Sequence, residues 1–498
     1  MTAFNLAAID IAWLPICPLI IVGVSAMAVL LAGVRVRDDE SQGLGVLTLA
    51  LIALAFVFAL GLLGQSGIAF AGAIAADNFA VFFELVILIS AALVVLMSID
   101  YLPAFGLSAA EYYALLLFST FGMMLMATGG DLIVIFIGFE VMSISVYVLA
   151  GFLRRSLKSN EAALKYFVMG AFSTAFLLYG IALVYGATGT IKLGPIRAAL
   201  SNPMAGNPLL LSGIGLMLVG FGFKVAAVPF HMWTPDAYEG APTPVTAFMA
   251  VGVKLGAFAG FIRIFMVHLG PVSPDWSIVL WVIAAFTMTV GNLVALVQVN
   301  IKRMLAYSAI AHAGYILVGM TAAGSQAGGA ILYYLLGYAF TNLGAFAAVI
   351  ALERRGVESD LITNYRGLAV RHPGLAAAMA LFLLSLTGVP PLAGFLGKFY
   401  IFSAALNAGL VWLVVIAVIN SVISAYYYIA VIVAMYMREG EAVVGALGRR
   451  PAVITALAVA AIGTVLIGIY PEPYITGALH AFNSAFGAAL PRTASILP

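Results

Sequence analysis

Four charged residues of this sequence stand inside long apolar runs, namely Glu140, Lys224, Lys254 and Lys398. If those runs cross a lipid bilayer, each charge costs about 2.5–3.5 kcal/mol near the bilayer centre on insertion scales, so such residues are rare and usually functional. A medium of low dielectric disfavours the charged form of an amine or a carboxyl, which brings both groups closer to neutrality. A proton then moves to or from them at small cost. The residue types therefore predict a buried path for protons.

The composition places most of the chain in a membrane. Of its 498 residues, 64% are hydrophobic and 8% are charged, whereas soluble domains carry about 25% charged residues. The net charge of +2 gives a nucleic-acid partner no electrostatic support. The single cysteine, Cys17, cannot form a disulfide within the chain, an iron–sulfur site or a zinc site alone, and we expect a small core residue. The first residues lack the basic start of a signal peptide, so the first apolar run is expected to be a retained helix.

The apolar runs indicate an all-α polytopic membrane protein with about 14 transmembrane helices, because a spanning helix needs roughly 20 apolar residues. The alternating pattern of a membrane β-barrel is absent. The predicted spans are 12–34, 44–64, 76–98, 112–128, 131–150, 162–186, 208–228, 243–268, 276–299, 303–322, 328–352, 374–404, 409–437 and 452–470.

The basic residues between these runs indicate an orientation, since cytoplasmic loops are enriched in lysine and arginine. With the N-terminus outside, fourteen basic residues fall in inside loops and three in outside loops. The inside residues are Arg35, Arg37, Arg154, Arg155, Lys158, Lys302, Arg303, Arg354, Arg355, Arg366, Arg371, Arg438, Arg449 and Arg450. The outside residues are Lys192, Arg197 and Arg492. Because the asymmetry persists along the chain, it supports the number of spans and an orientation with both termini outside.

The remaining five basic residues fall within predicted spans, and two of them lie near a span end. Lys165 follows Glu161 by four residues, the spacing of a helical ion pair. An interfacial pair and a role as a proton relay are equally compatible with its position. Arg263 lies near an outside end, where its long side chain is expected to reach the interface. Glu84 lies about eight residues into its predicted helix and is expected to be buried. The sequence identifies no partner for its carboxyl group, and a structural role is favoured.

Helix geometry places Glu140 near mid-membrane. Asp131 follows two glycines and is expected to cap the start of the helix that carries Glu140. Nine residues at 1.5 Å per residue put Glu140 about 13–14 Å along the helix axis. Ser143 and Tyr147 are expected to share its face.

Prolines are expected to break two helices beside buried lysines. Pro229 follows Lys224 by five residues, and His231 lies one heptad after Lys224, roughly on the same helix face. Pro390–Pro391 precede Lys398. Interrupted helices near the bilayer midplane mark ion sites in transporters.

Two further residues lie near the middle of their spans. Lys254 is about ten residues into its helix, and Gly252 and Gly256 allow a neighbouring helix to approach closely. His312 is nine residues into a helix that starts near Arg303. It either bridges a proton path or is a core histidine whose hydrogen bonds are satisfied, and the sequence leaves both open.

One interrupted helix in each half of the chain predicts an internal repeat, with the blocks 112–268 and 276–437 as its candidates. The predicted organisation is three transmembrane helices in 1–110, a first five-helix repeat in 111–270, a second in 271–440, and a last transmembrane helix with a tail in 441–498.

The stretches FKVAAVPFHMWTPDAYEGAPTPVTAF and TGVPPLAGFLGKFYIF resemble the antiporter-like membrane subunits of respiratory complex I, the proton-pumping NADH:quinone oxidoreductase. The resemblance covers about residues 80–470. It implies fourteen helices with two inverted five-helix repeats, and a charged axis with glutamate on helix five, lysines on helices seven and eight, and a charge on helix twelve. These positions match Glu140, Lys224, Lys254 and Lys398, whereas His312 is not carried over.

Within that family, a lysine on helix twelve and a chain that ends soon after helix fourteen resemble the N-type subunits. The resemblance implies that the chain lies in a bacterial inner membrane. It also implies as partners the other subunits of the complex I membrane arm, the lipid bilayer and protons. The sequence has no nucleotide-binding glycine motif after a strand and no cysteine cluster. NADH oxidation and quinone reduction are therefore expected on other subunits, with no cofactor in this chain.

Two other functions compete with this interpretation. A subunit of a multi-subunit sodium/proton antiporter would share the fold but would work without quinone chemistry. A purely structural scaffold would use its buried charges only to orient helices, but four deep charges on separate helices are costly for that role.

Overall fold

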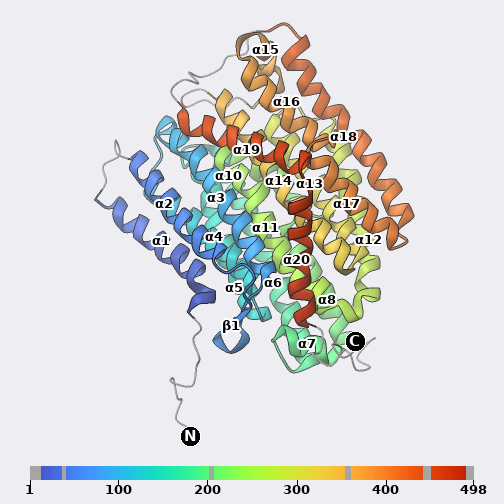
Figure 1. Ribbon diagram of the computed structural model, residues 1–498. Coiled ribbons are helices and arrows are strands. Elements are labelled where there is room, and N and C mark those ends of the chain that lie inside the picture. The colour runs from blue at the N-terminus through green and yellow to red at the C-terminus, as the bar shows by residue number, and fades with distance from the viewer. Residues whose placement is uncertain (1–12, 36–40, 201–206, 354–359, 441–449, 490–498) are drawn as a thin grey trace.

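The computed structural model describes residues 13–35, 41–200, 207–353, 360–440 and 450–489, and within them it is a helical bundle (Figure 1). The only sheet in this part of the chain is an antiparallel pair of short strands, β1 (Gly67–Ala69) and β2 (Ile74–Ala76). The N-terminal third contains η2 (Leu14–Ile16), α1 (Cys17–Gly33), α2 (Ser41–Leu60), η4 (Phe70–Gly72), α3 (Asn78–Phe105), α4 (Ala109–Thr128) and α5 (Leu132–Ala150).

The middle of the chain holds the first interrupted helix and the most buried span. Its elements are α6 (Leu157–Thr188), α7 (Leu193–Leu200), α8 (Pro208–Lys224), α9 (Trp233–Gly240), α10 (Thr243–Phe248), the π-helical η5 (Met249–Val253), α11 (Lys254–Phe261) and the π-helical η6 (Ile262–His268). The last four follow one another without a gap and form one span, Thr243–His268.

The C-terminal part contains the second interrupted helix. Its elements are η7 (Gly270–Val272), α12 (Ser273–Ala295), α13 (Ile301–Ala322), α14 (Gly324–Leu352), η8 (Ile362–Tyr365), α15 (Leu368–Arg371), α16 (Pro373–Thr387), α17 (Ala393–Asn407), α18 (Val411–Met437), α19 (Pro451–Ile469) and α20 (Glu472–Ala489).

The polytopic all-α class is confirmed. Among the described residues, 12 helices are long and apolar enough to cross a membrane. Two shorter apolar helices, α8 and α16, occupy the two other predicted spans, and each ends just before its prolines. The prolines therefore break the helices where the sequence predicts, because a proline removes a backbone donor and clashes with the preceding turn.

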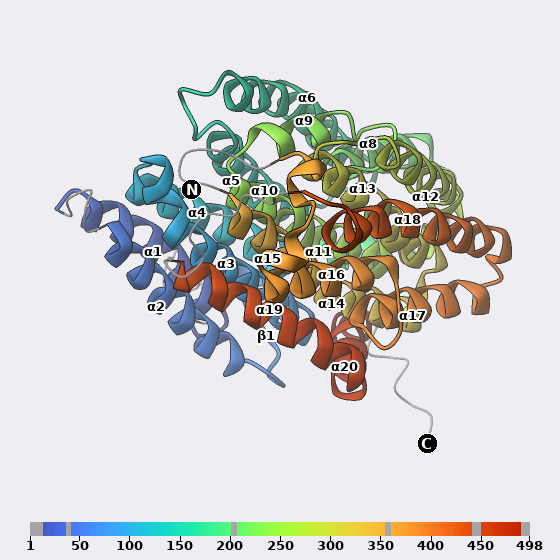
Figure 2. The same cartoon turned by 90° about the horizontal axis from the view of Figure 1, so that it is seen from above.

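Burial divides the spans into central and peripheral ones. The most apolar window of Thr243–His268 is fully buried, whereas only about a third of the window is buried in the peripheral helices α2, α6, α18 and α19. Figure 2 shows α10, α11 and α14 towards the middle, with α1 and α2 at one end and α17 and α18 at the other. Lys254 therefore lies on a central helix of the bundle.

The helix contacts follow similar patterns in the two halves. Helix α4 packs on α5 in the first half, and α12 packs on α13 in the second. Helix α6 packs on both α8 and α9, the two parts of the first interrupted helix, and α14 packs on α16 and α17, the two parts of the second. Two five-helix repeats would produce this correspondence, and the repeat boundaries remain a prediction.

Arg263 was expected to reach the interface, and that prediction is wrong. Its side chain is 3% exposed, and Nη1 and Nη2 donate to the carboxylate of Asp77 at 2.9 and 2.8 Å. Its Nε donates to the carbonyl oxygen of Ala127 at 2.8 Å. Asp77 also caps α3 by accepting from the Ala80 N–H. The arginine stays buried because a bidentate partner compensates its charge, and the pair joins α3, α4 and the central span.

The chain after residue 470 was expected to be a tail, but it contains α20. One face of α20 buries Ala478, Ala481 and Phe482 and packs on α14 and α3. The apolar-run criterion missed this helix because only one of its faces is apolar.

Candidate proton path

Glu140 lies in the middle of α5 and is only half-buried. The predicted cap of α5 is confirmed, since Asp131 accepts from the Val134 N–H at 2.7 Å. Thr174 of α6 donates to Glu140 Oε1 at 2.8 Å. The neighbours of Glu140 on its face of the helix, Ile137 and Ile144, are exposed. Glu140 therefore lies at a side of the bundle that this chain leaves open.

Lys224 is the last residue of α8 and is 1% exposed. Its Nζ has no hydrogen-bond partner among the described residues. It lies 5.1, 5.0 and 5.1 Å from the ring centroids of Phe139, Tyr147 and Tyr166, within the range of a cation–π interaction. The charge of Glu140 acts on Lys224 electrostatically. The structure thus places Lys224 of α8 against the rings of Phe139 and Tyr147 in α5, the helix that carries Glu140.

The interruption after Lys224 places His231 outside any helix. The chain between α8 and α9 is a series of turns, so the expectation that His231 continues the helix face of Lys224 is wrong, because helical spacing ends with α8. His231 is 9% exposed, and its Nδ1 has no hydrogen-bond partner in the described structure. The freed backbone is held by side chains, since Thr287 accepts from the Val228 N–H and Trp233 donates to the Phe223 carbonyl.

Lys254 lies at the centre of the buried span and is 2% exposed. Its Nζ donates to the carbonyl oxygen of Ala309 in α13. The close approach predicted at Gly256 is confirmed, because a Cβ there would lie 3.1 Å from the Cα of Met123 in α4. The π-helical segments η5 and η6 lie on either side of Lys254 in the chain, and such segments are frequent at functional sites.

His312 lies one turn after Ala309 on α13 and is 3% exposed. Its Nδ1 is 2.5 Å from the Tyr334 hydroxyl and its Nε2 is 3.2 Å from the Tyr428 hydroxyl. Lys254 donates to Ala309, one turn before His312, and Lys398 Nζ lies 4.9 Å from the ring centroid of Tyr315, which packs against His312. His312 therefore lies close to the surroundings of both buried lysines and has hydrogen-bond partners on both ring nitrogens.

A small cavity beside His312 supplies polar surroundings. Its volume of about 10 Å³ is close to the minimum for one water molecule. The cavity is lined by His312, Tyr334, Tyr338, Thr341, Ser385, Leu386 and Gly394.

Lys398 lies in α17, just after the second interruption, and is 4% exposed. Its Nζ donates to the carbonyl oxygens of Leu386 and Thr387 at 3.1 and 2.9 Å and to the Ser421 hydroxyl at 2.9 Å. Because α16 ends at Thr387, its last carbonyls have no partner within the helix. The break therefore creates the acceptors that hold the buried lysine.

Lys165 lies apart from these residues, at the predicted inside face. The predicted pair with Glu161 is present at 2.7 Å, and a second pair joins Lys165 to Asp236 of α9 at 2.7 Å. Its side chain is 44% exposed. Arg303 of α13 bridges Asp236 and Glu239 at 2.8 and 2.9 Å, so three helices are tied together at this face.

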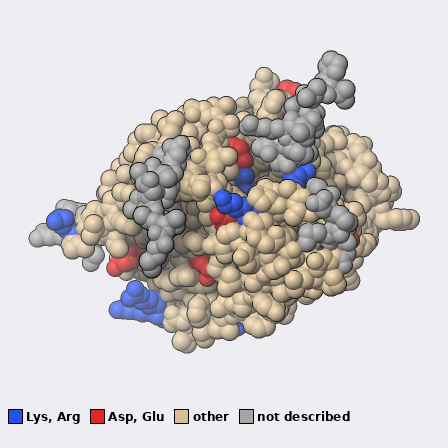
Figure 3. Space-filling view, turned by 90° about the horizontal axis from the view of Figure 1, so that it is seen from below, with Lys and Arg blue, Asp and Glu red and all other residues tan. Residues whose placement is uncertain are grey.

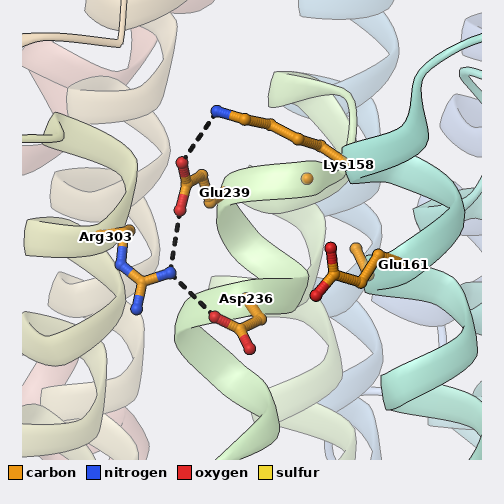
Figure 4. A pocket seen from close by; sticks show the side chains of 7 residues that line it. Lys158, Glu161, Asp236, Glu239 and Arg303 are labelled. Atoms are coloured by element: carbon orange, nitrogen blue, oxygen red, sulfur yellow. Dashed lines mark hydrogen bonds and ion pairs between the residues drawn. The ribbon is translucent and has the colours of Figure 1, made fainter.

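A cavity of about 210 Å³ opens inside this network (Figure 4). Figure 4 shows Asp236 and Glu239 pointing from α9 toward Arg303, with Lys158 and Glu161 on the facing helix α6. Figure 3 shows the face that carries β1 and α7, where basic and acidic side chains gather near the middle of a surface that is otherwise mostly uncharged. Sequence reasoning missed this cavity, although two acids in the WTPDAYEG segment were a signal.

Apart from Tyr147, sequence reasoning also missed the buried tyrosines around the lysines. Tyr166 stacks on Trp233, which also packs against Tyr238, and Tyr338 packs against His312. The hydroxyls of Tyr147, Tyr166 and Tyr238 have no partner among the described residues. Such buried hydroxyls are usually satisfied by ordered water.

Comparison with known proteins agrees with this architecture. Residues 129–424 match the family described as NADH:quinone oxidoreductase/Mrp antiporter, TM. The chain is 48% identical over 467 residues to NADH-quinone oxidoreductase subunit N of Trichlorobacter lovleyi, covering 94% of this chain and 96% of that protein.

Two solved structures share the fold. A chain of respiratory complex I from Thermus thermophilus is 35% identical, with a TM-score of 0.78 over 92% of this chain and 98% of that chain. A chain of the Mrp complex from a Dietzia species is 22% identical, with a TM-score of 0.80 over 94% of this chain and 97% of that chain, and this likeness concerns the fold alone. On the sequence identity to its relatives, the chain belongs to the subunit N family of the NADH-quinone oxidoreductases.

Proposed function

We propose that this chain is a proton-translocating subunit in the membrane arm of an NADH:quinone oxidoreductase. The observation that carries the proposal is the set of three lysines, Lys224, Lys254 and Lys398, each at most 4% exposed and each on a different span. Such groups are expensive in a membrane and mark ion or proton paths. NADH oxidation and quinone reduction would occur on other subunits, and this chain would contribute no redox step and bind no cofactor of its own. The membrane would be a bacterial inner membrane.

The path would begin at the pair of Glu140 and Lys224. While Glu140 is charged, it favours a charged Lys224. When Glu140 is neutralised or drawn away, Lys224 becomes a better proton donor, because its charge is buried without a hydrogen-bond partner. The proton would then pass through water to Lys254, across His312, and to Lys398.

The open position of Glu140 supports a role at a contact with another subunit. A half-buried carboxyl between exposed isoleucines, Ile137 and Ile144, would be costly against lipid. A neighbouring subunit that covers this face would control the charge state of Glu140. Quinone reduction elsewhere could reach the lysines by this route.

Protons would enter through the cavity at the predicted inside face. Ala162 lines that cavity, and Tyr166 lies one turn further along the same face of α6. The ring of Tyr166 is 5.1 Å from Lys224 Nζ and stacks on Trp233 of α9 at 4.0 Å. The stacked rings of Tyr166 and Trp233 would therefore lie on the route from the cavity to Lys224.

A bulky thiol reagent attached in this cavity is expected to slow proton entry. In Glu161→Cys, labelling with a charged, membrane-impermeant methanethiosulfonate from the inside face should lower pumping several-fold, because the adduct fills a cavity of about 210 Å³. The measurement is proton uptake by reconstituted vesicles before and after labelling, with the rate of NADH oxidation recorded in parallel.

Asn160→Cys is the matched control, because Asn160 is exposed on the same turn of α6 but does not line the cavity. Labelling at that site should leave pumping unchanged. Equal pumping by labelled Glu161→Cys and labelled Asn160→Cys complexes would rule out entry through this cavity.

The proposed orientation, with both termini on the periplasmic side, predicts opposite labelling at two exposed positions. Val370 of α15 and Ile68 of β1 are 86% and 69% exposed and lie in connections between spans, on opposite sides of the fourteen-span arrangement. An impermeant thiol reagent should reach Val370→Cys only from the cytoplasmic side and Ile68→Cys only from the periplasmic side. Access to Val370→Cys from the periplasm would overturn the orientation.

The competing function, a subunit of a sodium/proton antiporter, shares the fold of this chain. The 48% identity to a quinone oxidoreductase subunit, against 22% to the Mrp chain, favours the redox-driven complex. Flavin and iron–sulfur subunits that purify together with this chain in mild detergent would separate the two.

A further inference from the structure

Glu84 is a buried carboxyl that the proposed path does not use. It lies in α3 and is 1% exposed, and its Oε1 has no hydrogen-bond partner in the described part of the chain. Buried polar atoms without a partner are rare, and each requires a water, an ion or a functional explanation. An ionisable side chain inside a membrane helix is a functional candidate.

The packing of α3 on the central span places Glu84 level with Lys254. Helix α3 contacts the span from α10 to α11, and the start of α3 meets the end of the span through Asp77 and Arg263, so the two run in opposite directions. Glu84 lies seven residues inward from Asp77, about 10 Å along the helix. Lys254 lies nine residues inward from Arg263, about 13–14 Å. The depths of the two residues therefore differ by about 3 Å.

The side chain of Glu84 lies on a fully packed face of α3. Its neighbours on that face, one turn before and one turn after it, are Ala80, Ile87 and Leu88, and each is at most 1% exposed. Glu84 thus lies inside the packed bundle, on a helix that contacts the span of Lys254, and about two turns inward from the ion pair of Asp77 and Arg263.

A second unsatisfied group lies at the same level. Ser119 of α4 is fully buried, and its Oγ has no partner among the described residues. It lies one turn from Met123, whose side chain packs against Gly256 of the central span. Ser119 therefore faces the same span within about two turns of Lys254, and water is the group that satisfies such atoms.

We propose that Glu84 is a further proton-carrying residue, on a branch of the path that leads from Lys254 toward Asp77 at the outer end of α3. A proton would leave the Lys254 ammonium, cross water between the helices and bind the Glu84 carboxylate, which yields a neutral amine and a neutral acid. Its release from Glu84 to water on the outer side would restore the carboxylate. This branch rests on the proposed function of the chain.

The experiment compares Glu84→Gln with Glu84→Asp in the assembled complex. Gln keeps the shape and neutrality of a protonated acid but cannot carry a proton, whereas Asp can. We expect Glu84→Gln to lower proton pumping about tenfold or more, and Glu84→Asp to recover a large part of it. A carboxyl C=O infrared band that shifts in deuterated water and changes during turnover should disappear in Glu84→Gln.

Each result separates the branch from the proposed function. Full pumping by Glu84→Gln would overturn the branch, and if Lys224→Met has lost pumping in the same assay, the proposed function stands. Full pumping by Lys224→Met would overturn the proposed function itself. If neither Glu84 variant assembles, Ser119→Ala is the second test, because it removes one water ligand without changing a charge. The branch would be overturned if Ser119→Ala pumps as the wild type does and the wild-type complex shows no carboxyl infrared band that changes during turnover.

Discussion

Lys224→Met is expected to abolish proton pumping while the complex still assembles. The Nζ of Lys224 makes no hydrogen bond within the described structure, and it lies about 5 Å from three aromatic rings. Met fills the same space without a charge, so helix packing should tolerate it. A positioned proton-transfer group contributes on the order of 100-fold to 10,000-fold in rate, and its removal should reduce pumping through this chain by at least that lower factor.

The measurement is the number of protons moved per electron in reconstituted vesicles, with NADH oxidation recorded in parallel. Lys192→Met is a suitable control, because Lys192 is exposed and its Nζ donates to the Ala71 carbonyl, far from the buried lysines. Glu140→Gln should also reduce pumping, since it removes the charge that acts on Lys224. An assembled Lys224→Met complex with the wild-type ratio of protons to electrons would refute the proposed path.

Arg263→Met is expected to destabilise the protein rather than to alter its chemistry. Removal of one partner from a buried ion pair costs about 3–5 kcal/mol, because the other charge stays buried without compensation. Asp77 would lose two hydrogen bonds from the guanidinium, and α4 would lose its link through Ala127. The expected result is less assembled complex and a lower unfolding temperature in detergent.

The double variant Arg263→Met with Asp77→Asn tests the physical reason. Because Asn is neutral and can still cap α3, the double variant should recover part of the lost stability. A double variant less stable than Arg263→Met alone would contradict the assignment of the loss to an uncompensated charge.

The spans and their interruptions could be predicted from the sequence because their causes are local. Apolar run length identifies a spanning helix, and a proline breaks a helix wherever it stands. The cap at Asp131 is equally local, since it depends on a residue three positions away. The three lysines could be recognised as buried because their runs contain few other charges.

Contacts between distant parts of the chain could not be predicted in this way. Arg263 and Asp77 are 186 residues apart, so the sequence offered no reason to pair them, and Arg263 was placed at the interface. The tyrosines around His312 come from α14 and α18, and only packing brings them together. His231 was placed on a helix face because spacing alone does not identify where α8 ends.

The two interrupted helices have a consequence for the sign of the buried charges. The C-termini of helices α8 and α16, at Lys224 and Thr387, both lie inside the membrane. The aligned peptide dipoles of a helix place about half a negative charge at that end. Lys398 lies directly on this end of α16. The two helices enter the membrane from opposite sides, yet each presents the negative end of its dipole at the break. This negative end favours a cation at each break and disfavours a carboxylate. The direction of the chain at each break, and not only the neighbouring side chains, thus favours lysine as the residue that carries the proton there.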